Sequence, residues 1–358
     1  MADDRMTAVY DREALRKKYE NYLVPAARVS VGGREITPGL AQLEGVQVSL
    51  NLDAAASASF TVTDIYDLQG HSLKAAVKSA FACGASVKIE LGYGSEYEDV
   101  FHGFIYETSV QFSDFPSMQV TAMDVKRLLA DNTRSGHVWR EKTVSAIFSE
   151  VLSGFPGLGL NVRVEDKGSE VIDQCIQRGS DLYLVKKLCR DKALQFLVYG
   201  DQAKLFAKQQ TTPMLTLAWG SEILSFTRGE SYVNVRVEVR GSMKGSPESG
   251  PVILSEAVSS PGAAASGLSA TEKIIELTNV ETKEEVSDRL KDEVDALKES
   301  MYSGRGSCVG MPVLQPGRYI TIAGLDEEVN GDYYLKSVSH SFGGDGFATD
   351  FTLGGKKA

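Results

Sequence analysis

The sequence predicts a β-rich α+β protein in which two similar small antiparallel β-barrel domains, tube-like in form, flank an inserted α+β domain. Three observations lead to this fold class. Short runs of alternating apolar and polar residues recur in both outer parts of the chain, helices with capping residues lie between them, and the strand pattern of residues 85–124 returns in residues 316–354. Short strands separated by turns are typical of sandwiches and small barrels. A length of 358 residues fits two or three domains.

The first part of the chain is expected to hold an arm and the first barrel. Residues 1–25 are assigned to an N-terminal arm with a short helix at 11–23, which ends before Pro25. This helix either packs on its own domain or docks on a neighbour. Residues 26–124 are assigned to the first barrel, because runs such as Val46–Leu50 alternate at period two. A helix is expected to interrupt the barrel at 71–81.

Residues 125–230 are expected to form the inserted α+β domain. Thr143 is a capping residue before one apolar helical stripe, and Ser180 begins a second helix. Two apolar runs on either side of Gly200-Asp201 then predict a hairpin.

Residues 231–358 are assigned to the second barrel. Residues 232–240 alternate strictly, residues 241–272 are rich in Gly, Ser, Pro and Ala and predict a loop, and residues 282–301 predict a helix. Thr282 and Glu285 form the capping box of that helix. Its narrow apolar stripe favours packing on its own sheet over pairing with a partner helix.

Residues 85–124 and 316–354 share one layout. Each opens with a short strand after a glycine, Gly84 or Gly317, and continues with an acidic loop, a long aromatic strand and an alternating strand. Identity between the two stretches is low, so either a duplicated module or a chance likeness of two antiparallel meanders explains the pattern.

Composition excludes several classes of protein. The net charge of −10 argues against a protein that wraps DNA or binds anionic membranes, since both need clustered Lys and Arg. The first residues lack an apolar core, so no secretory signal is expected, and no apolar run is long enough to cross a membrane. Cys83, Cys175, Cys189 and Cys308 form no CxxC pair and are expected to be reduced thiols of a protein made in a cytoplasm.

No pattern of catalytic or cofactor-binding residues stands out, so we expect no enzyme activity, no cofactor and no metal. His71, His102, His137 and His340 lack metal-ligand spacing, and His340 is expected to be structural. The acids Glu96, Glu98 and Asp99, and the acids Asp326, Glu327 and Glu328, are expected on solvated hairpin loops. Two alternatives stay open: a tail-associated peptidoglycan hydrolase, and a carbohydrate- or receptor-binding β protein, although Trp139 and Trp219 are the only tryptophans.

Several segments carry a family resemblance. PGRYITIAG (316–324), NGDYYLKSVSHSF (330–342) and GFATDFTL (346–353) resemble the late control protein D family, the baseplate hubs of contractile phage tails, and are similar to the amino-terminal hub part of type VI secretion spike proteins. VFHGFIYETSVQF (100–112) with MQVTAMD (118–124), and residues 178–207, resemble further parts of that family.

The resemblance implies a structural baseplate hub: a homotrimer whose two barrels per chain form a pseudo-sixfold ring, joining the tail tube to the central spike of a contractile injection system. The implied partners are a central spike protein, a tail tube or tube-initiator protein and baseplate wedge proteins, with no membrane or specific nucleic acid. The implied location is the virion tail baseplate. The sequence ends at Ala358 directly after the second barrel, so we expect the spike on a separate polypeptide, which favours a phage-like tail over a type VI system.

The resemblance carries over no catalytic residue. It marks nine positions as structural: Phe101, Gly103, Ser180, Asp181, Pro316, Gly317, Gly331, Tyr334 and His340. From the overall charge we further expect the inner wall of the ring to be acidic or neutral.

Overall fold

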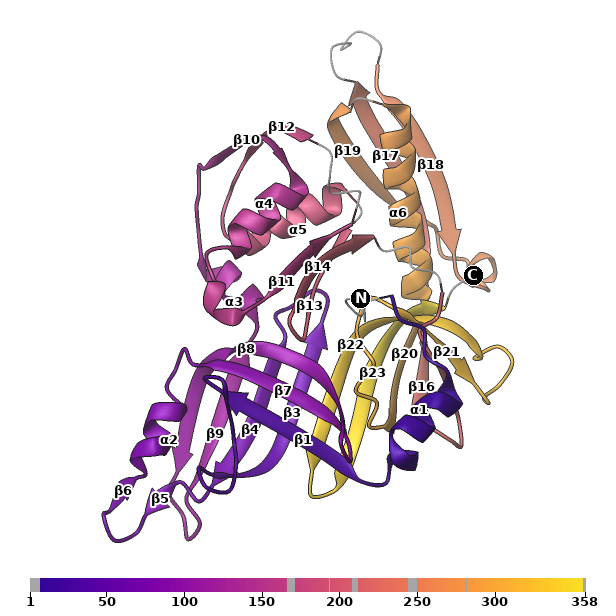
Figure 1. Ribbon diagram of the computed structural model, residues 1–358. Helices are drawn as coiled ribbons and strands as arrows, with labels where there is room; N and C mark the ends of the chain where they lie inside the picture. The colour runs from indigo at the N-terminus through magenta and orange to yellow at the C-terminus, as the bar shows by residue number, and fades with distance from the viewer. Residues whose placement is uncertain are drawn as a thin grey trace.

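A computed structural model describes residues 7–165, 171–192, 194–207, 212–243, 250–280 and 282–356. Within these ranges one large sheet occupies the lower half of the molecule, and two smaller α/β units stand above it (Figure 1). None of the described helices combines the length and apolar composition needed to cross a bilayer.

The large sheet takes strands from both ends of the described chain. Its 13 strands follow the order β16-β20-β23-β22-β3-β4-β9-β8-β7-β1-β2, and β21 pairs with β22 and with β15. The strands from the first part are β1 (Pro25–Val31), β2 (Arg34–Glu35), β3 (Gln42–Asn51), β4 (Ser57–Thr63), β7 (Ser86–Tyr93), β8 (Glu96–Gln111) and β9 (Ser117–Met123). The strands from the second part are β15 (Thr216–Ala218), β16 (Ile223–Glu230), β20 (Tyr302–Val309), β21 (Tyr319–Ala323), β22 (Gly331–Gly343) and β23 (Gly346–Lys356).

The two predicted barrels contribute to one continuous sheet. Strand β3 pairs antiparallel with β22, from Asn51 opposite Ser337 to Val46 opposite Phe342. The β-rich character and the antiparallel pairing are therefore confirmed, while the closure of each half into a barrel remains a prediction.

The strand connectivity of the first half is repeated in the second. Strands β3, β4, β7, β8 and β9, here called the first repeat, lie in the order β3-β4-β9-β8-β7. Strands β16, β20, β21, β22 and β23, the second repeat, lie in the corresponding order β16-β20-β23-β22-β21.

The irregularities of the two repeats also coincide. The register of β3 shifts between Leu43 and Gly45, and that of β16 shifts between Ile223 and Ser225. The register of β8 against β9 shifts between Ile105 and Glu107, and β22 shifts against β23 between Leu335 and Ser337. Because bulges are specific features of a fold, their recurrence at matching places supports a structural duplication.

The glycine before the third strand of each repeat has the same conformation. Gly84 has φ +88° and Gly317 has φ +86°, values that favour glycine. The amide of Gly84 donates to the carbonyl of Ile105 at 2.8 Å, and the amide of Gly317 donates to the carbonyl of Leu335 at 2.9 Å. The similar layout seen in the sequence thus extends to single hydrogen bonds.

The first smaller unit follows β9 and has its own hydrophobic core. Trp139 and Phe148 lie in that core, between three helices and two small sheets. Its elements are α3 (Val125–Asp131), β10 (Val138–Thr143), α4 (Val144–Leu152), the 3-10 turn η2 (Pro156–Leu158), β11 (Asn161–Val164), β12 (Val171–Ile176), α5 (Asp181–Asp191), β13 (Leu194–Tyr199) and β14 (Gln202–Ala207). Strands β15 and β16, which lie within the range 125–230, join the large sheet instead of this unit.

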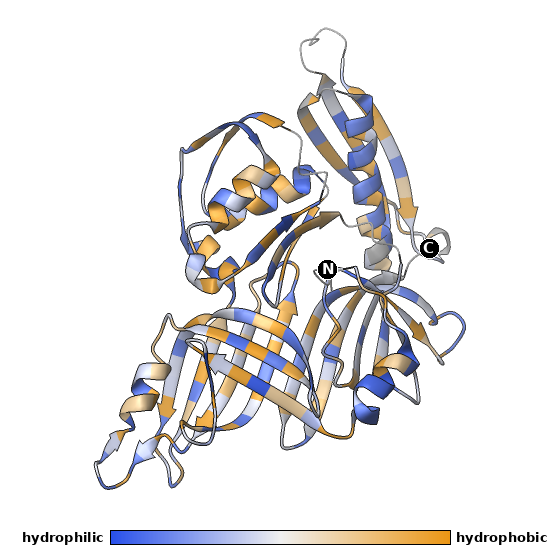
Figure 2. Ribbon diagram, viewed as in Figure 1, coloured by the Kyte–Doolittle hydropathy of each residue, from blue (hydrophilic) through white to orange (hydrophobic). Residues whose placement is uncertain are grey.

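The second smaller unit lies between β16 and β20 and consists of β17 (Asn234–Met243), β18 (Val252–Ser259), the 3-10 turn η5 (Ala263–Ser266), β19 (Thr271–Val280) and α6 (Lys283–Met301). The predicted loop at 241–272 is wrong here, because β18 pairs with β17 along its whole length. The Gly, Ser, Pro and Ala residues around this short strand masked its apolar character. Helix α6 packs its apolar stripe on this sheet, as expected, and shows a largely hydrophilic face to solvent (Figure 2).

The N-terminal arm packs on the large sheet. It contains α1 (Arg12–Lys18) and the short turn η1 (Glu20–Tyr22), and it buries Leu15 and Tyr19 in the main core. Its ion pairs reach both repeats, from Arg12 to Glu222 at 2.7 Å and from Lys18 to Glu98 at 2.6 Å. The predicted interruption of the first barrel is also present, as β5 (Tyr66–Asp67), β6 (Ser72–Leu73) and α2 (Ala75–Ala80).

Candidate functional site: the hydroxyl-lined face of the large sheet

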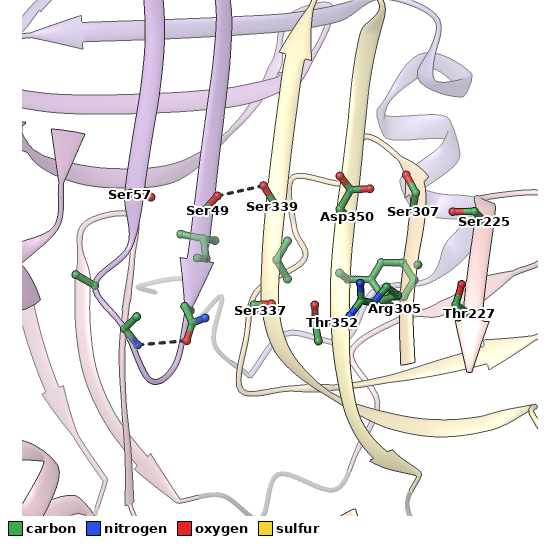
Figure 3. Close-up of a pocket in the computed structure, with 17 residues that line it drawn as sticks. Ser49, Ser57, Ser225, Thr227, Arg305, Ser307, Ser337, Ser339, Asp350 and Thr352 are labelled. Atoms are coloured by element: carbon green, nitrogen blue, oxygen red, sulfur yellow. Dashed lines mark hydrogen bonds between the residues drawn. The ribbon is translucent and has the colours of Figure 1, made fainter. Parts of the chain in front are cut away.

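A row of small polar side chains crosses six neighbouring strands of the large sheet. Direct cross-strand pairing links Ser225, Ser307, Asp350, Ser339, Ser49 and Ser57 in that order. Figure 3 shows these side chains side by side on one face of the sheet. The hydroxyls of Ser49 and Ser339 approach to 3.2 Å where the two repeats meet.

A second row runs parallel to the first. Thr227, Arg305, Thr352, Ser337 and Asn51 are likewise paired from strand to strand. Arg305 and Asp350 are the charged side chains of these two rows (Figure 3). One cation and one anion leave this part of the face close to neutral.

The polar face continues onto the rest of the first repeat. Gln47 lies opposite Ser59, Ser59 opposite Thr121, and Thr121 opposite Glu107. The polar face therefore spans the sheet from β16 to β8.

Alternation within the strands separates this face from the core. In β3, Val46, Val48 and Leu50 are buried, while Gln47 and Ser49 lie on the open side. Because successive side chains of a strand point to opposite faces, each strand places its hydroxyls on one face and its apolar residues on the other. The alternation was predicted from the sequence but this polar face was not, although Ser, Thr, Asn and Gln at every second position of the strands indicate it.

The two rows border an open hollow of about 590 Å³. Ala54 and Ala55, in the β3–β4 loop, line one end of it. Hydroxyl groups exchange hydrogen bonds readily with water and carry no fixed charge, so the face can stay hydrated beside a passing polymer without binding it tightly.

The family-marker residues of the first repeat lie away from this face. Phe101 is buried in the main core and forms a bridge to Gly200 of the first smaller unit. A Cβ on Gly103 would lie 2.2 Å from the carbonyl oxygen of Met123, so the close approach of β8 to β9 requires glycine there.

Ser180 and Asp181 organise the first smaller unit. The Ser180 hydroxyl accepts a hydrogen bond from the Tyr183 amide at 3.2 Å and caps α5. The fully buried Asp181 carboxylate accepts hydrogen bonds from Asn132 and Gln177, both at 2.7 Å, and forms an ion pair with Arg134 at 3.3 Å. A buried carboxylate held by three donors has a structural role, because its charge is compensated on the spot.

The markers of the second repeat lie where it meets the first smaller unit. Pro316 and Gly317 are buried, and a Cβ on Gly317 would lie 2.5 Å from the Phe206 ring. The Tyr334 hydroxyl donates to the side-chain carbonyl of Gln195. Gly331 begins β22.

His340 is a core residue, as its place in the strand predicted. Its ring is fully buried, with Nδ1 3.0 Å from the Thr349 hydroxyl, and burial lowers the pKa of His340 to about 4. The imidazole is therefore neutral near pH 7.

The expectation of solvated acids on the first hairpin is wrong for two residues. Glu98 is buried and accepts hydrogen bonds from Lys18 at 2.6 Å and from the Tyr19 hydroxyl at 3.3 Å, while Asp99 forms an ion pair with His102 at 2.8 Å. These residues lie within β8, and the N-terminal arm that covers Glu98 is distant in sequence. Asp326, Glu327 and Glu328 lie in the exposed turn between β21 and β22.

Among the described residues, no cluster of three His, Cys, Asp or Glu side chains has the geometry to hold a metal ion. Trp139 is buried, and Trp219 is half exposed near the start of β16.

The fold is shared with tail proteins of known structure. A tail protein from Neisseria meningitidis MC58 matches with a TM-score of 0.67 over 92% of this chain and 96% of its own, at 14% identity. The 43 kDa tail protein of prophage MuSo2 from Shewanella oneidensis matches with a TM-score of 0.68 over 92% and 98%, also at 14% identity. An Escherichia coli component of the type VI secretion system matches with a TM-score of 0.58 over 92% and 79%, at 12% identity.

These similarities confirm, at the level of the fold, the resemblance to tail hub proteins. Residues 23–343 match the family described as the Alg8 N-terminal domain, and the chain belongs to that family. No curated protein sequence matches the chain.

Proposed function

We propose that this protein is a structural hub of a tail baseplate, in which three copies form a ring of six repeats between the tail tube and the central spike. The observation that carries the proposal is the repeated strand connectivity within one continuous sheet. Two equivalent repeats per chain let three chains present near-sixfold symmetry at one end and threefold symmetry at the other. In this proposal each repeat closes into a small barrel with its neighbouring strands, and the shared fold of the tail proteins supports the role.

The hydroxyl-lined face is the proposed inner wall of the ring. It is near-neutral over its central rows, with Arg305 beside Asp350, and it carries the acidic Glu107 on β8. A wall without clustered Lys and Arg does not hold a polyanion by its phosphates, so nucleic acid can pass without being retained. Spike, tube and wedge proteins are the proposed partners, and the particle is assembled from protein made in the bacterial cytoplasm.

The smaller units stand together at one end of the sheet (Figure 1). The first follows β9, and the second is inserted between β16 and β20. In a ring they form a second tier on one side of the channel, where they enlarge the surface available to a partner.

Purified protein examined by light scattering and negative-stain imaging tests the proposal. The expected result is a species of three chains with a central hole, stabilised when a spike protein is added. A strict monomer at all concentrations that also fails to bind a spike protein would overturn it. The proposal also assigns no enzyme activity, and measurable clearing of peptidoglycan by the protein would contradict that part.

A further inference from the structure

The antiparallel run of strands from β16 to β8 has two open edges. Strand β16 pairs with β20, and β8 pairs with β9 from Glu107 to Gln111. Strand β7 pairs with the other side of β8 as far as Phe104, and Gly84 and Ala85 just before β7 still form hydrogen bonds to Ile105. In the described part of the chain, the edge of β16 beyond Ile223, which forms an isolated bridge to Trp219, and the edge of this segment of β8 have no partner strand. Unpaired amides and carbonyls at such edges are templates for another strand.

Exposed apolar side chains gather near both edges. Tyr106 and Phe112 lie exposed along the open segment of β8, and Leu224 and Trp219 lie exposed at the start of β16. Phe112 is 66% exposed, with the edge of its ring in contact with Tyr66 at a centroid distance of 5.7 Å. These side chains indicate a surface that is covered in the assembled protein.

The internal repeat shows how such edges can join. The register shifts make β22 the counterpart of β8, with Ser337 corresponding to Glu107. They likewise make β3 the counterpart of β16, with Gly45 corresponding to Ser225. The two counterparts, β22 and β3, already pair with each other inside the chain.

The register of that internal pair carries over residue by residue. Ser341 lies opposite Gln47, and His340 lies opposite Val48. Counted from these matched positions, Ser341 and His340 of β22 correspond to Gln111 and Val110 of β8. In the same way, Gln47 and Val48 of β3 correspond to Thr227 and Arg228 of β16.

We infer that β8 of one copy pairs antiparallel with β16 of the next copy, with Gln111 opposite Thr227 and Val110 opposite Arg228 of that copy. This inference rests on the proposed ring and adds the residues and the register of its contact. All seven strand pairs between β16 and β8 are antiparallel, so these end strands run in opposite directions and form an antiparallel pair when copies join head to tail. A head-to-tail contact closes into a ring when the rotation between successive copies adds up to a full turn, as the proposed threefold ring requires.

The exposure of Phe112 follows from the same register. Its counterpart Phe342 is half buried and lies opposite Val46, whose own counterpart is Phe226. In the joined sheet Phe112 faces Phe226 of the next copy, and an exposed ring becomes covered.

Disulfide trapping tests the register. In a Cys83→Ser background, which removes the exposed thiol, we combine Gln111→Cys with Thr227→Cys and oxidise concentrated protein. Side chains directly opposite each other in a sheet have Cβ atoms about 4.5–5.5 Å apart, which a disulfide can span. The expected product is a covalent multimer ending at three chains, reversed by reductant.

The matched control moves one cysteine along the same face of the same strand: Gln111→Cys with Ser225→Cys. A register two residues off separates the Cβ atoms by about 7–8 Å, so linking is expected to fall at least ten-fold. Ser49→Cys with Ser339→Cys should form an internal link in a monomer and verifies that oxidation works.

Two results would overturn the junction. Equal linking of the matched and shifted pairs would exclude the register, and no linking of either pair in protein that light scattering shows to be trimeric would exclude the contact. Both leave the hub role standing, because that role fails on a different observation, a monomer that does not bind a spike protein.

Discussion

The hydroxyls of Ser49 and Ser339 lie 3.2 Å apart across the one strand pair, β3 with β22, that joins the two repeats into a single sheet. The contact lies on the polar face, while Leu50 and Val338, the next pair in the register, lie buried on the core side. The junction between repeats therefore has the same two-sided construction as the strands inside each repeat. The polar face is therefore continuous across both repeats.

The core side of this sheet is expected to carry the stability. Phe351 is buried, and its ring lies where a Cβ on Gly306 would come within 2.6 Å. Phe351→Ala should lower the free energy of unfolding by about 3–5 kcal/mol, because it removes the ring and leaves a cavity. Chemical denaturation measures this, and Thr352→Ala, on the exposed polar face next to it, should change stability by less than about 0.5 kcal/mol.

Acid should destabilise the protein through His340. Burial lowers its pKa to about 4 in the folded state from the ordinary value of 6.5, so between these pH values the unfolded chain binds more protons. Stability from this residue is present above pH ~6.5 and is lost as the pH falls toward ~4, by at most about 3 kcal/mol. Denaturation midpoints measured across this range should become lower as the pH is lowered from about 6.5 to about 4.

His340→Leu separates this effect from general acid denaturation. The variant should show a flatter pH dependence between about 6.5 and 4 than the parent, because it has no imidazole to protonate. Substitution of the exposed His71 by alanine should leave the slope unchanged. Identical slopes for His340→Leu and the parent would rule out this histidine as the cause.

Lys126 is expected to secure the first smaller unit on the large sheet. Its buried ammonium donates hydrogen bonds to the carbonyls of Asn51 and Leu52, both at 3.1 Å, and of Ala54 at 3.3 Å. Desolvation lowers the pKa of Lys126 to about 8 and raises that of nearby Asp124 to about 6. Lys126→Met should cost about 3–5 kcal/mol, because it leaves Asp124 and the loop carbonyls without the cation.

Thermal or chemical unfolding measures the effect of Lys126→Met. Lys187→Met, on the exposed side of α5, is the matched control and should unfold like the parent. If the two variants were equally stable, the buried ammonium of Lys126 would have no role in holding the first smaller unit on the large sheet.

The polar face should gain nucleic-acid binding when lysines are added to it. The parent is expected not to shift single-stranded DNA in a gel at ~100 mM salt, because the face has no cationic cluster. The triple variant Ser49→Lys, Ser339→Lys and Ser225→Lys places three cations in one row and should bind DNA, with an affinity that falls steeply with salt. The same number of lysines at Ser113, Ser255 and Gln69, scattered over exposed positions, should bind far more weakly. Strong binding of DNA by the parent would contradict the proposal that the inner wall of the ring does not retain nucleic acid.

Much of the local structure was predictable from the sequence. Alternation at period two located strands such as β3, β17 and β23, capping residues located α4, α5 and α6, and the shared layout after Gly84 and Gly317 indicated a repeat. These features depend on contacts between near neighbours in the chain, so a local pattern is enough to define them. The strand β18 was missed because turn-forming residues surround it.

The sequence by itself determined the β-rich class, the two similar meanders, the structural role of His340 and the apolar faces of the helices. Only the tertiary structure decided that β3 pairs with β22, that hydroxyls from six strands form one surface, that α1 covers Glu98, and that β16 and β8 end the run with open edges. The physical reason is that a strand's alternation fixes which of its faces is buried, whereas its neighbour depends on packing between residues hundreds of positions apart.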